Sequence, residues 1–328
     1  MKAVILAAGY GKRMGKLAES LPKPLIPIAN KPILQHLIES LNKSGVKNFV
    51  IAVGHLKDQI ISFLTTFQKN GIELTIKNAK DFKKGPIYSF YACRDEIKDE
   101  DFILTPADLL IDPSFLLEIF QKSKEQKIML AFDDGQINSH HTTIYLSKNN
   151  KIRNVLGITS NVIGGESVVK LLLPLLICRV NIQSYIEMSL NLKHKRVIDA
   201  IELYLQQKNV ATAYKIQNRY WFELDTISDI LRANEFFLNL RIGKDQTIIN
   251  SKEPISRNIS IKNPILIGKN CQIENNCVLG PNVSIGNNTH IGKNVKIQNA
   301  IICPSSEIPK NTKLENAIFF RLKYNIDS

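Results

Sequence analysis

Aliphatic residues recur every six positions near the end of this 328-residue chain, and this period constrains the fold more than any other feature. The first row is Ile249, Ile255, Ile261, Ile267, Ile273, Leu279, Ile285, Ile291 and Ile297. A second row, two positions ahead, is Ile259, Ile265, Cys271, Cys277, Val283, Thr289, Val295 and Ile301. Helices repeat every 3.6 residues and strands every two, so neither explains a period of six. A solenoid built from hexads does.

In such a solenoid each hexad forms one face of a triangular coil and points its aliphatic residue inward. Asparagines at 270, 276, 282, 288 and 294 stand where tight corners require left-handed backbone, with glycines at 268, 280, 286 and 292 between the rows. We therefore expect a short parallel β-helix of about four coils over residues 249–320. The register slips after Cys303, and Ile308 and Leu314 continue it.

The sequence before the hexads alternates short aliphatic strands with amphipathic helices. Strands are expected at 4–6, 49–53, 72–76, 102–104, 128–132, 168–180 and 211–216, with a hairpin around 149–150. Helices are expected at 33–44, 60–67, 86–97, 115–120, 197–207 and 227–240. This alternation predicts an α/β domain, residues 1–244, with a Rossmann-like, mostly parallel sheet, followed by the β-helix domain, residues 245–328. Ligands should gather at the carboxyl ends of the strands.

A loop of small residues and cations follows the first strand, in the order Ala7-Ala8-Gly9-Tyr10-Gly11-Lys12-Arg13. Glycines let the backbone approach a ligand and turn its N–H groups toward an anion. About ten residues later, Pro22 and Pro24 stiffen the chain on either side of Lys23. The pattern favours a polyphosphate site over a plain flexible basic loop.

These residues resemble the signature of the sugar-1-phosphate nucleotidylyltransferases, a strand, L-A-A-G-x-G-x-R, a spacer and P-K-P-L. Arg13 replaces the third glycine of a dinucleotide-binding loop, and no Gly-Lys-Ser/Thr is present. The resemblance implies that Ala8, Gly9 and Gly11 hold a nucleoside triphosphate. It also implies that Arg13 and Lys23 bind its phosphates and act catalytically on the departing pyrophosphate.

The same resemblance places base recognition at Asn78 and Gly85, although a plain loop asparagine explains Asn78 equally well. The run Lys83-Lys84-Gly85-Pro86-Ile87-Tyr88 is closer to the variant in archaeal polyol-phosphate cytidylyltransferases. Sugar-phosphate binding would fall on Glu166 and Lys170. Ordinary surface charges are an equal alternative there, because the family's sugar segment is not recognisable.

Carboxylates at two distant places resemble the family's magnesium ligands. Asp108 follows the strand 102–104, and Glu223 and Asp225 lie in Trp221-Phe222-Glu223-Leu224-Asp225-Thr226, which resembles W-x-D-V-D-T. Oxygen ligands completed by phosphates and water suit Mg²⁺. Asp225 is equally explained as the N-cap of the next helix, a role open to Thr226 as well, and Asp112 before Pro113 is better explained as a helix start.

Composition limits the binding partners and the cellular location that we expect. The net charge of +13 is scattered rather than clustered, without the aromatic-rich strand motifs of single-strand binders, so we expect anionic small substrates and no nucleic acid. No apolar run approaches the roughly 20 residues that cross a bilayer, and the chain starts with a strand, so we expect a cytoplasmic protein with no membrane association. Five cysteines without a CxxC pair suggest reduced, buried thiols.

The sequence thus predicts a nucleotidylyltransferase that joins an NTP and a sugar-1-phosphate, giving a nucleotide-sugar and pyrophosphate. No general base is expected, since the attacking phosphate is already ionised and no histidine lies near a motif in the sequence. The alternatives are a non-catalytic regulatory paralogue that binds nucleotide-sugar, and a polyol-phosphate cytidylyltransferase. The hexads resemble the left-handed β-helix appended to many members of the family, which implies a homo-oligomer. An acetyltransferase role there is disfavoured because His290 is its only histidine.

Overall fold

The computed structural model describes residues 1–67, 71–98, 100–135, 142–146, 150–156, 168–252 and 255–320. The chain forms two compact units, each of them discontinuous in sequence. Residues 1–10 and 37–221 form the first, here called the α/β unit. Residues 11–36 and those from 222 onward form the second, the β-helix unit. The signature loop therefore passes from one unit to the other between Tyr10 and Gly11.

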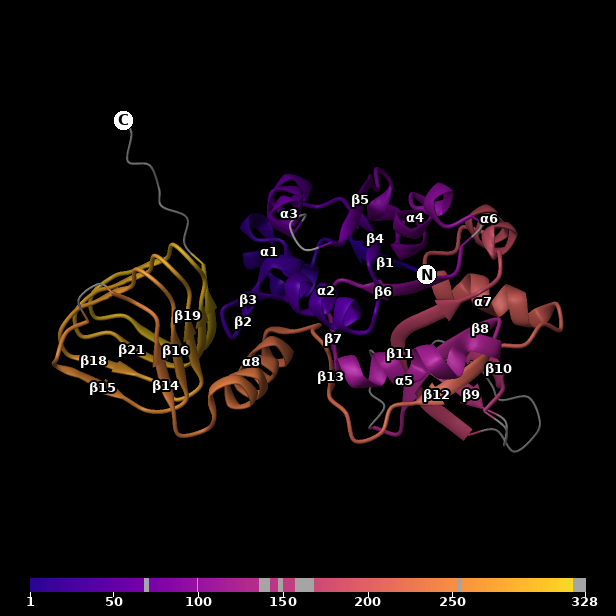
Figure 1. The fold of residues 1–328 in the computed structure, drawn as a ribbon. Coiled ribbons are helices and arrows are strands. Elements are labelled where there is room, and N and C mark those ends of the chain that lie inside the picture. Colours follow the sequence, from indigo (N-terminus) through magenta and orange to yellow (C-terminus); the bar gives the residue numbers. More distant parts are fainter. Residues whose placement is uncertain are drawn as a thin grey trace. The chain divides into compact units, whose positions relative to one another are not determined.

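A mixed sheet forms the centre of the α/β unit (Figure 1). Its main strands are β1 (Lys2–Ala7), β4 (Asn48–Val53), β5 (Glu73–Asn78), β6 (Phe102–Pro106), β8 (Ile128–Asp133), β11 (Val168–Cys178) and β12 (Thr212–Lys215). They lie in the order β5-β4-β1-β6-β11-β8-β12, and β11 alone among these seven runs antiparallel to its neighbours β6 and β8. The mostly parallel α/β sheet predicted from the sequence is confirmed.

Shorter strands complete this unit. β9 (Thr143–Leu146) and β10 (Ile152–Leu156) pair antiparallel, as predicted for a hairpin, and β9 also pairs with the first half of β11. β7 (Leu109–Ile111) follows β6, and Trp221, the first residue of β13 (Trp221–Glu223), ends the unit. The hydrophobic pattern of β11, which is buried from Leu171 to Cys178 apart from Pro174, fits a central strand covered on both faces.

The helices are α1 (Leu17–Ser20), α2 (Ile33–Lys43), α3 (Lys57–Leu64), α4 (Pro86–Tyr91), α5 (Pro113–Lys122), α6 (Gln183–Asn191), α7 (Val197–Gln206) and α8 (Ile227–Ile242). Side chains of α4, α6 and α7 pack in one core cluster with residues of β1, β4, β6 and β8. The predicted helix at 86–97 is wrong in length. It ends at Tyr91, whose carbonyl accepts a hydrogen bond from Arg94 Nη1 at 3.1 Å instead of continuing the helical ladder.

In the described part of the chain, six 3₁₀ turns lie between these elements, at Lys12–Met14, Lys23–Leu25, Thr65–Phe67, Phe82–Lys84, Arg94–Glu96 and Ser123–Glu125. The sequence pattern also missed α6. Its buried apolar side chain, Ile186, and Ile182 just before the helix give too short a stripe to stand out in the sequence. The described residues contain no helix that is both long and apolar enough to cross a bilayer.

Short parallel strands form the β-helix (Figure 1), and the described residues contain ten of them. They are β14 (Thr247–Ile249), β15 (Ile259–Ile261), β16 (Ile265–Ile267), β17 (Gln272–Ile273), β18 (Cys277–Leu279), β19 (Val283–Ile285), β20 (His290–Ile291), β21 (Lys296–Ile302), β22 (Glu307–Ile308) and β23 (Lys313–Phe319). Ile265 pairs with Val283 and Val278 with Lys296, so successive coils are 18 residues apart. The predicted period of three hexads per coil is confirmed.

The corners of the coils confirm the role of asparagine. Asn270, Asn276, Asn282, Asn288 and Asn294 all have positive φ, between 54° and 62°. Their amides also form ladders between coils, as when Asn276 Nδ2 donates to Asn294 Oδ1 at 3.3 Å and Asn294 Nδ2 donates to Asn311 Oδ1 at 2.9 Å. One residue type thus satisfies both the backbone geometry and the polar groups of the corners.

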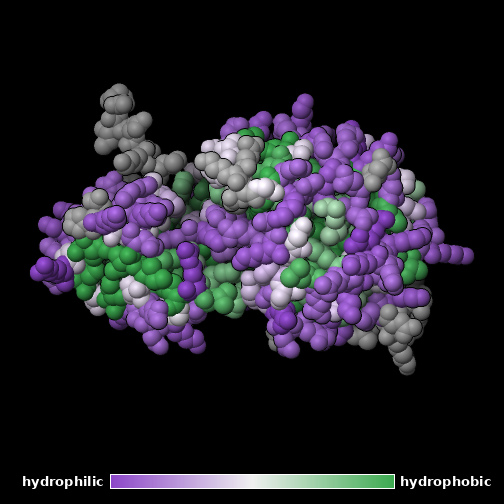
Figure 2. All heavy atoms as spheres, in the orientation of Figure 1, coloured by the Kyte–Doolittle hydropathy of each residue, from purple (hydrophilic) through white to green (hydrophobic). Residues whose placement is uncertain are grey.

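One detail of the predicted register is wrong. The offset between coils falls from 18 to 17 residues between Ile297 and Ala300, around the left-handed Asn299, which is earlier than Cys303. Ile249 and Ile261 keep the predicted register, since they pair with Ile267 and Leu279 of the next coil, but they belong to the first coil and are 44% and 36% exposed. Figure 2 shows hydrophobic side chains gathered over the β-helix face where β14 and β15 lie.

Residues 11–36 also belong to the β-helix unit. They contain a two-stranded hairpin formed by β2 (Pro27–Ile28) and β3 (Lys31–Pro32), shortly after the Pro-Lys-Pro segment.

All five cysteines are buried free thiols, as predicted, and burial raises the pKa of Cys93, Cys178 and Cys303 to about 12. These thiols therefore stay protonated near neutral pH.

Candidate functional site

Predicted residues of the α/β unit lie at the carboxyl ends of β1, β5 and β6, three of the four neighbouring parallel strands β5, β4, β1 and β6. Ala8 follows β1, Asn78 ends β5 and Asp108 follows β6 by two residues. The Ala107 N–H donates to Leu6 O at 3.0 Å, which holds the turn before Asp108 against the end of β1. Ala8 is buried, Asp108 is half-buried, and Gly9 and Asn78 are exposed. Parallel strands bring these positions to one edge of the sheet, the usual place for a ligand in such folds.

Gly54, which the sequence reasoning did not select, lies at the same edge after β4. A Cβ there would approach Phe82 Cγ at 2.7 Å and Ala8 Cβ at 2.9 Å. Only glycine therefore lets Phe82, which comes just after β5, pack against the start of the signature loop. The parallel register of β1 and β4 would have pointed to this position, since it pairs Ala7 with Val53.

Gly85 is also required by close packing. Its φ is 142°, and a Cβ there would lie 2.6 Å from Lys195 O. The same carbonyl accepts a hydrogen bond from Ile87 N at 3.1 Å, so the turn before α7 lies directly against the start of α4. The structure thus gives Gly85 a packing role, and base recognition by Asn78 and Gly85 stays a prediction.

A histidine does lie beside the loop, contrary to the expectation from the sequence. The His55 N–H donates to Ala8 O at 3.1 Å, and the His55 ring stacks on Tyr10 with centroids 4.0 Å apart. Tyr10 stands between the two glycines of the signature, and its side chain is 42% exposed. The stack orders a residue of the loop at the point where the chain leaves the α/β unit.

The remaining signature residues lie in the β-helix unit. Gly11 adopts left-handed backbone with φ 65°, and the Met14 N–H donates to its carbonyl at 2.8 Å, which starts the 3₁₀ turn that carries Arg13. A Cβ on Gly11 would be 3.4 Å from Lys23 Cβ. The glycine loop and the Pro-Lys-Pro segment are therefore in contact, as expected if both serve one ligand.

One carboxylate joins the two cations of the signature. Arg13 Nη1 lies 2.5 Å from Asp225 Oδ2, and Lys23 Nζ lies 3.4 Å from Asp225 Oδ1. The side chain of Lys23 is 10% exposed, whereas that of Arg13 is 50% exposed. The structure thus brings together three residues that the sequence analysis selected from segments about two hundred positions apart.

The N-cap alternative for Asp225 is resolved. Thr226 is the N-cap of α8, where its hydroxyl accepts from Asp229 N at 3.2 Å and the Asp229 carboxylate accepts from Thr226 N at 2.9 Å. This reciprocal capping box satisfies the start of the helix without Asp225. The charge of Asp225 is therefore available for Arg13 and Lys23. Asp112 is likewise the N-cap of α5, as predicted.

Glu223 and Asp108 are both half-buried carboxylates and both have polar partners of their own. Leu224, next to Glu223, is fully buried. Among the described residues, no three His, Cys, Asp or Glu side chains converge into a group that could hold a metal ion. Any metal bound here would depend on other ligands for most of its coordination.

A charged cluster surrounds Lys170, one of the two predicted sugar-phosphate residues. Its Nζ lies 2.6 Å from Asp134 Oδ1, and Lys215 Nζ contacts the other oxygen of the same carboxylate. Hydrogen bonds from Lys170 and Lys215 hold the pKa of Asp134 below its usual range. Lys215, at the end of β12, was not selected from the sequence. Glu166 lies outside the described residues.

The residue before this cluster carries a second link. Asp133, the last residue of β8, accepts a hydrogen bond from Trp221 Nε1 at 2.8 Å, and its other oxygen accepts from Asp134 N at 2.7 Å. Trp221 is the only tryptophan of the chain. Its fluorescence would therefore report on events at this edge of the sheet.

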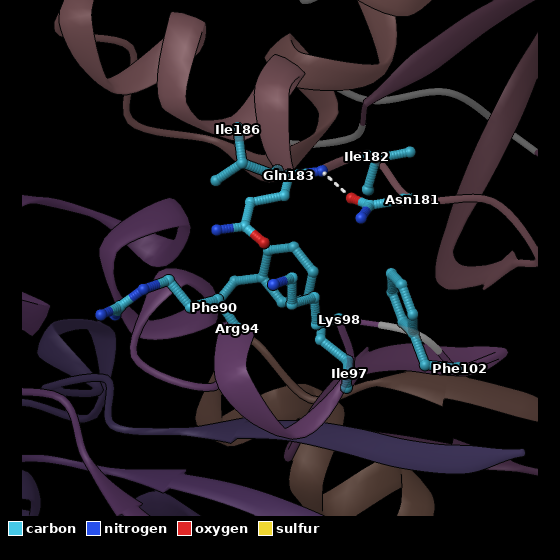
Figure 3. A pocket seen from close by; sticks show the side chains of 9 residues that line it. All are labelled: Phe90, Arg94, Ile97, Lys98, Phe102, Asn181, Ile182, Gln183 and Ile186. Atoms are coloured by element: carbon cyan, nitrogen blue, oxygen red, sulfur yellow. Dashed lines mark hydrogen bonds between the residues drawn. The ribbon is translucent and has the colours of Figure 1, made fainter.

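A pocket of the α/β unit lies away from these residues (Figure 3). Phe90, Ile97, Phe102, Ile182 and Ile186 form its apolar walls, with Arg94, Lys98, Asn181 and Gln183 around them. Phe102 begins β6, so the pocket is at the opposite end of that strand from Asp108. Its volume of about 20 Å³ holds about one water molecule, which excludes it as a substrate site.

Comparison with known proteins defines the class. Residues 3–218 match the MobA-like NTP transferase domain, and residues 245–321 match the GMPPB C-terminal domain. The chain therefore belongs to the nucleotidyltransferases that combine an NTP transferase domain with this C-terminal domain.

Individual relatives agree with this assignment. The chain is 30% identical over 274 residues to the bifunctional protein GlmU of Methanococcus maripaludis strain C5, covering 81% of this chain and 60% of the relative. A 118-residue stretch, 35% of this chain and 32% of the relative, is 36% identical to the mannose-1-phosphate guanylyltransferase catalytic subunit beta of Xenopus tropicalis. The chain thus spans about three fifths of the length of the GlmU relatives.

The fold also matches a solved structure, the inositol-1-phosphate CTP transferase from T. maritima. The TM-score is 0.58 at 20% identity, covering 70% of this chain and 90% of that one. At this identity the match concerns the fold alone, and it agrees with the α/β sheet described above.

Proposed function

We propose that this protein transfers a nucleotidyl group from an NTP to a sugar-1-phosphate and releases pyrophosphate. An oxygen of the acceptor's phosphate attacks the α-phosphorus, and the bond from that phosphorus to the bridging oxygen of pyrophosphate breaks. The acceptor phosphate is already ionised near neutral pH, since its second pKa is about 6. The protein therefore has to align the reactants and neutralise charge, without a general base.

The observation that carries this proposal is the contact of Arg13 and Lys23 with Asp225. Two cations that follow a glycine loop are held by one acid, at positions that match the signature residue by residue. We assign to both the neutralisation of charge on the triphosphate and on the departing pyrophosphate. Asp225 orients them in the absence of substrate, and Ala8, Gly9 and Gly11 supply the backbone N–H groups of the loop.

Carboxylate oxygens are the ligands that suit Mg²⁺, and Asp108 and Glu223 fit that chemistry as half-buried acids. We propose that these two hold the ion, with Asp225 joining them when substrate phosphates draw Arg13 and Lys23 away. When bound, magnesium would withdraw charge from the phosphates. Because the described carboxylates form no ligand group of three, the phosphates themselves would complete the coordination.

The acceptor is proposed to bind near Lys170 and Glu166, the two residues that the sequence predicts for the sugar phosphate. Lys215 is added because it shares the Asp134 carboxylate with Lys170. Two ammonium groups beside one acid leave one net positive charge for a phosphate. Asn78 and Gly85 stay the candidates for the base. The base and the acceptor differ among the relatives named above, so a polyol phosphate is included among the acceptors to be tested.

The exposed aliphatic residues of the first coil support a homo-oligomer formed through the β-helix, with Ile249 and Ile261 in the interface. We further propose a cytoplasmic location, where the free, buried thiols would stay reduced. Neither proposal affects the chemistry of transfer.

The test is a substrate panel that measures pyrophosphate release from each NTP with common sugar-1-phosphates and inositol-1-phosphate, in the presence of Mg²⁺. We expect one combination to exceed all others. Asp108→Asn, which keeps the shape of the side chain and removes its charge, is the matched control and should lose turnover by orders of magnitude. If no combination exceeds that control, the proposed function is wrong, and a regulatory protein that only binds nucleotide-sugar becomes the better explanation.

A further inference from the structure

The turn of the β2–β3 hairpin is held in an unusual backbone conformation. Ala29 and Asn30, its two central residues, have φ values of 46° and 61°. Such turns prefer glycine or asparagine at both positions, because a Cβ is disfavoured in left-handed backbone. Ala29 is nevertheless an alanine and is 1% exposed. Surrounding contacts must therefore hold this turn in place.

Those contacts come from α8 and the β-helix. Asn234 Oδ1 accepts hydrogen bonds from Ala29 N and from Ser284 Oγ, both at 2.9 Å. Arg241 Nη1 donates to Ala29 O at 2.8 Å, so both polar groups of the Ala29 backbone are bound by α8. Asn30 Nδ2 donates to Ile285 O, in β19, at 2.8 Å. The turn thus contacts both the helix and a coil of the solenoid.

Asn234 is the centre of this arrangement. It and Ser284 are fully buried, and the Asn234 Nδ2 group has no hydrogen-bond partner among the described residues. Its Oδ1 atom accepts from two buried donors, the Ala29 N–H and the Ser284 hydroxyl, which an apolar residue here would leave without an acceptor. Asn234 therefore fixes the position of the Ala29 backbone, although its own Nδ2 group has no partner among the described residues.

A short, stiff segment connects this turn to Lys23. Ile26 N donates to Lys23 O at 3.1 Å, and Ile33 N donates to Ile26 O at 3.1 Å. Pro24 and Pro27 fix two further backbone angles within the segment. A displacement of Ala29 would therefore be transmitted to Lys23 rather than absorbed by a flexible loop.

The same helix also fixes the partner of Lys23. α8 begins at Ile227, two residues after Asp225, and Asn234 lies about two turns further along the helix. One rigid element thus sets Asp225 near its start and the hairpin along its side. The position of the Lys23 ammonium, 3.4 Å from the Asp225 carboxylate, therefore depends on α8 twice, once through Asp225 and once through the hairpin.

We propose that Asn234 is a positioning residue, which places Lys23 for catalysis through the Ala29 turn, and that Ser284 connects the β-helix to this function. The inference rests on the proposed function for the role of Lys23. It gives the β-helix a part in the chemistry that is separate from any oligomer. Removal of the Asn234 acceptor should loosen the hairpin and misplace the ammonium group.

A double-mutant cycle tests this relation. Asn234→Leu should lower kcat by about 10- to 100-fold, the range expected when a catalytic group is misplaced by about 1 Å, with a smaller change in the KM for NTP. In the Lys23→Ala background the same substitution should cost less than about twofold, since the group it positions is gone. Equal losses in both backgrounds would show that Asn234 acts independently of Lys23 and would overturn the proposal.

Ser284→Ala provides a milder variant with a matched control. It removes one donor to Asn234 Oδ1 and should lower kcat by about two- to tenfold. Ser306 is also a buried serine of the β-helix, but its hydroxyl donates to Cys303 O inside the solenoid at 2.7 Å, so Ser306→Ala should leave kcat unchanged. Equal losses of kcat in the two variants would mean that any defect in the solenoid lowers activity, and the proposal would fail.

A readout independent of turnover separates this inference from the proposed function. Amide hydrogen exchange at Ala29 should accelerate at least tenfold in Asn234→Leu and remain at the wild-type rate in Ser306→Ala. An unchanged rate at Ala29 in Asn234→Leu would overturn the positioning role even in a fully active enzyme. An inactive wild-type protein with accelerated exchange in Asn234→Leu would instead refute the proposed function and leave the structural link standing.

Discussion

The two units use their strands in opposite ways. In the α/β unit the strands are buried in the sheet, and the residues of interest lie in the turns after them, such as Ala8, Gly54 and Asp108. In the β-helix unit each coil repeats the last, and the polar residues of the corners bind each other in asparagine ladders. The first arrangement leaves strand ends open for a ligand, whereas the second uses its corners for stability.

The comparison also shows that the signature residues are not all in the unit that the first part of the sequence would suggest. The signature loop begins in the α/β unit, but Gly11, Arg13 and Lys23 belong to the β-helix unit together with Asp225. A repetitive domain that follows an enzyme domain in the sequence is therefore part of the scaffold of the proposed site.

The largest effect is expected from the two cations of the signature. Arg13→Ala and Lys23→Ala should each lower turnover by about 10²–10³-fold, as removal of one preorganised charge-stabilising group does. Circular dichroism should show that both variants stay folded. Lys16→Ala, which removes an exposed lysine from the same segment, should keep wild-type turnover. Equal effects of all three would indicate that only the net charge of the segment matters.

The aliphatic rows should differ in their contribution between inner coils and the first coil. Ile285→Ala removes a fully buried side chain and should lower the free energy of unfolding by about 2–5 kcal/mol. Ile261→Ala, in the first coil and 36% exposed, should cost at most about 1 kcal/mol. Urea unfolding measures both. A cost for Ile261 as large as that for Ile285 would mean that another surface covers the first coil in solution.

The corner asparagines should be worth less than the core. Asn276→Ala places a Cβ in left-handed backbone at φ 62° and removes ladder contacts to Asn258 and Asn294, at a total cost of about 1–3 kcal/mol. Asn276→Gly relieves the backbone and removes only the ladder, so its cost should be smaller. If thermal unfolding shows equal losses, the ladder alone explains asparagine at the corners.

The smallest effect concerns pH in the α/β unit. The pKa of Asp134 is lowered below its usual 3.8 by Lys170 and then Lys215, so its carboxylate stabilises the fold above that pH. This contribution is lost as the pH falls through the lowered pKa. Asp134→Asn should therefore be less stable than wild type at neutral pH, and the gap should close in acid. The effect will be small because the side chain is 40% exposed and screened by solvent. A gap that stays constant with pH would contradict this assignment.

Periodic features of the sequence predicted the fold well. The hexads gave the solenoid and its 18-residue coils, and alternation gave the sheet, because both patterns depend on local burial repeated many times. Single events were not predictable in this way. The one-residue slip around the left-handed Asn299 and the end of α4 at Tyr91 are single local events that no period records.

For the site, the sequence identified residues but not their relations. Arg13, Lys23 and Asp225 were all selected, yet their shared contact depends on a fold that joins segments far apart in the chain. Gly54 and Lys215 were missed because their importance lies in neighbours from other strands, Ala8 and Phe82 for the first and Asp134 for the second. Asn234 was missed for the same reason, since an asparagine inside a helix looks ordinary until its partners are known.

The most direct test of the account follows the α-phosphate itself. An NTP labelled with ³²P at the α-position is incubated with the acceptor that the substrate panel selects, and the labelled products are separated by chromatography. We predict that the label passes into a nucleotide-sugar, or its polyol equivalent, in a one-to-one ratio with released pyrophosphate, and that Lys23→Ala nearly abolishes the transfer. Label that stays in the NTP, or appears only in free NMP, would contradict nucleotidyl transfer as the function of this protein.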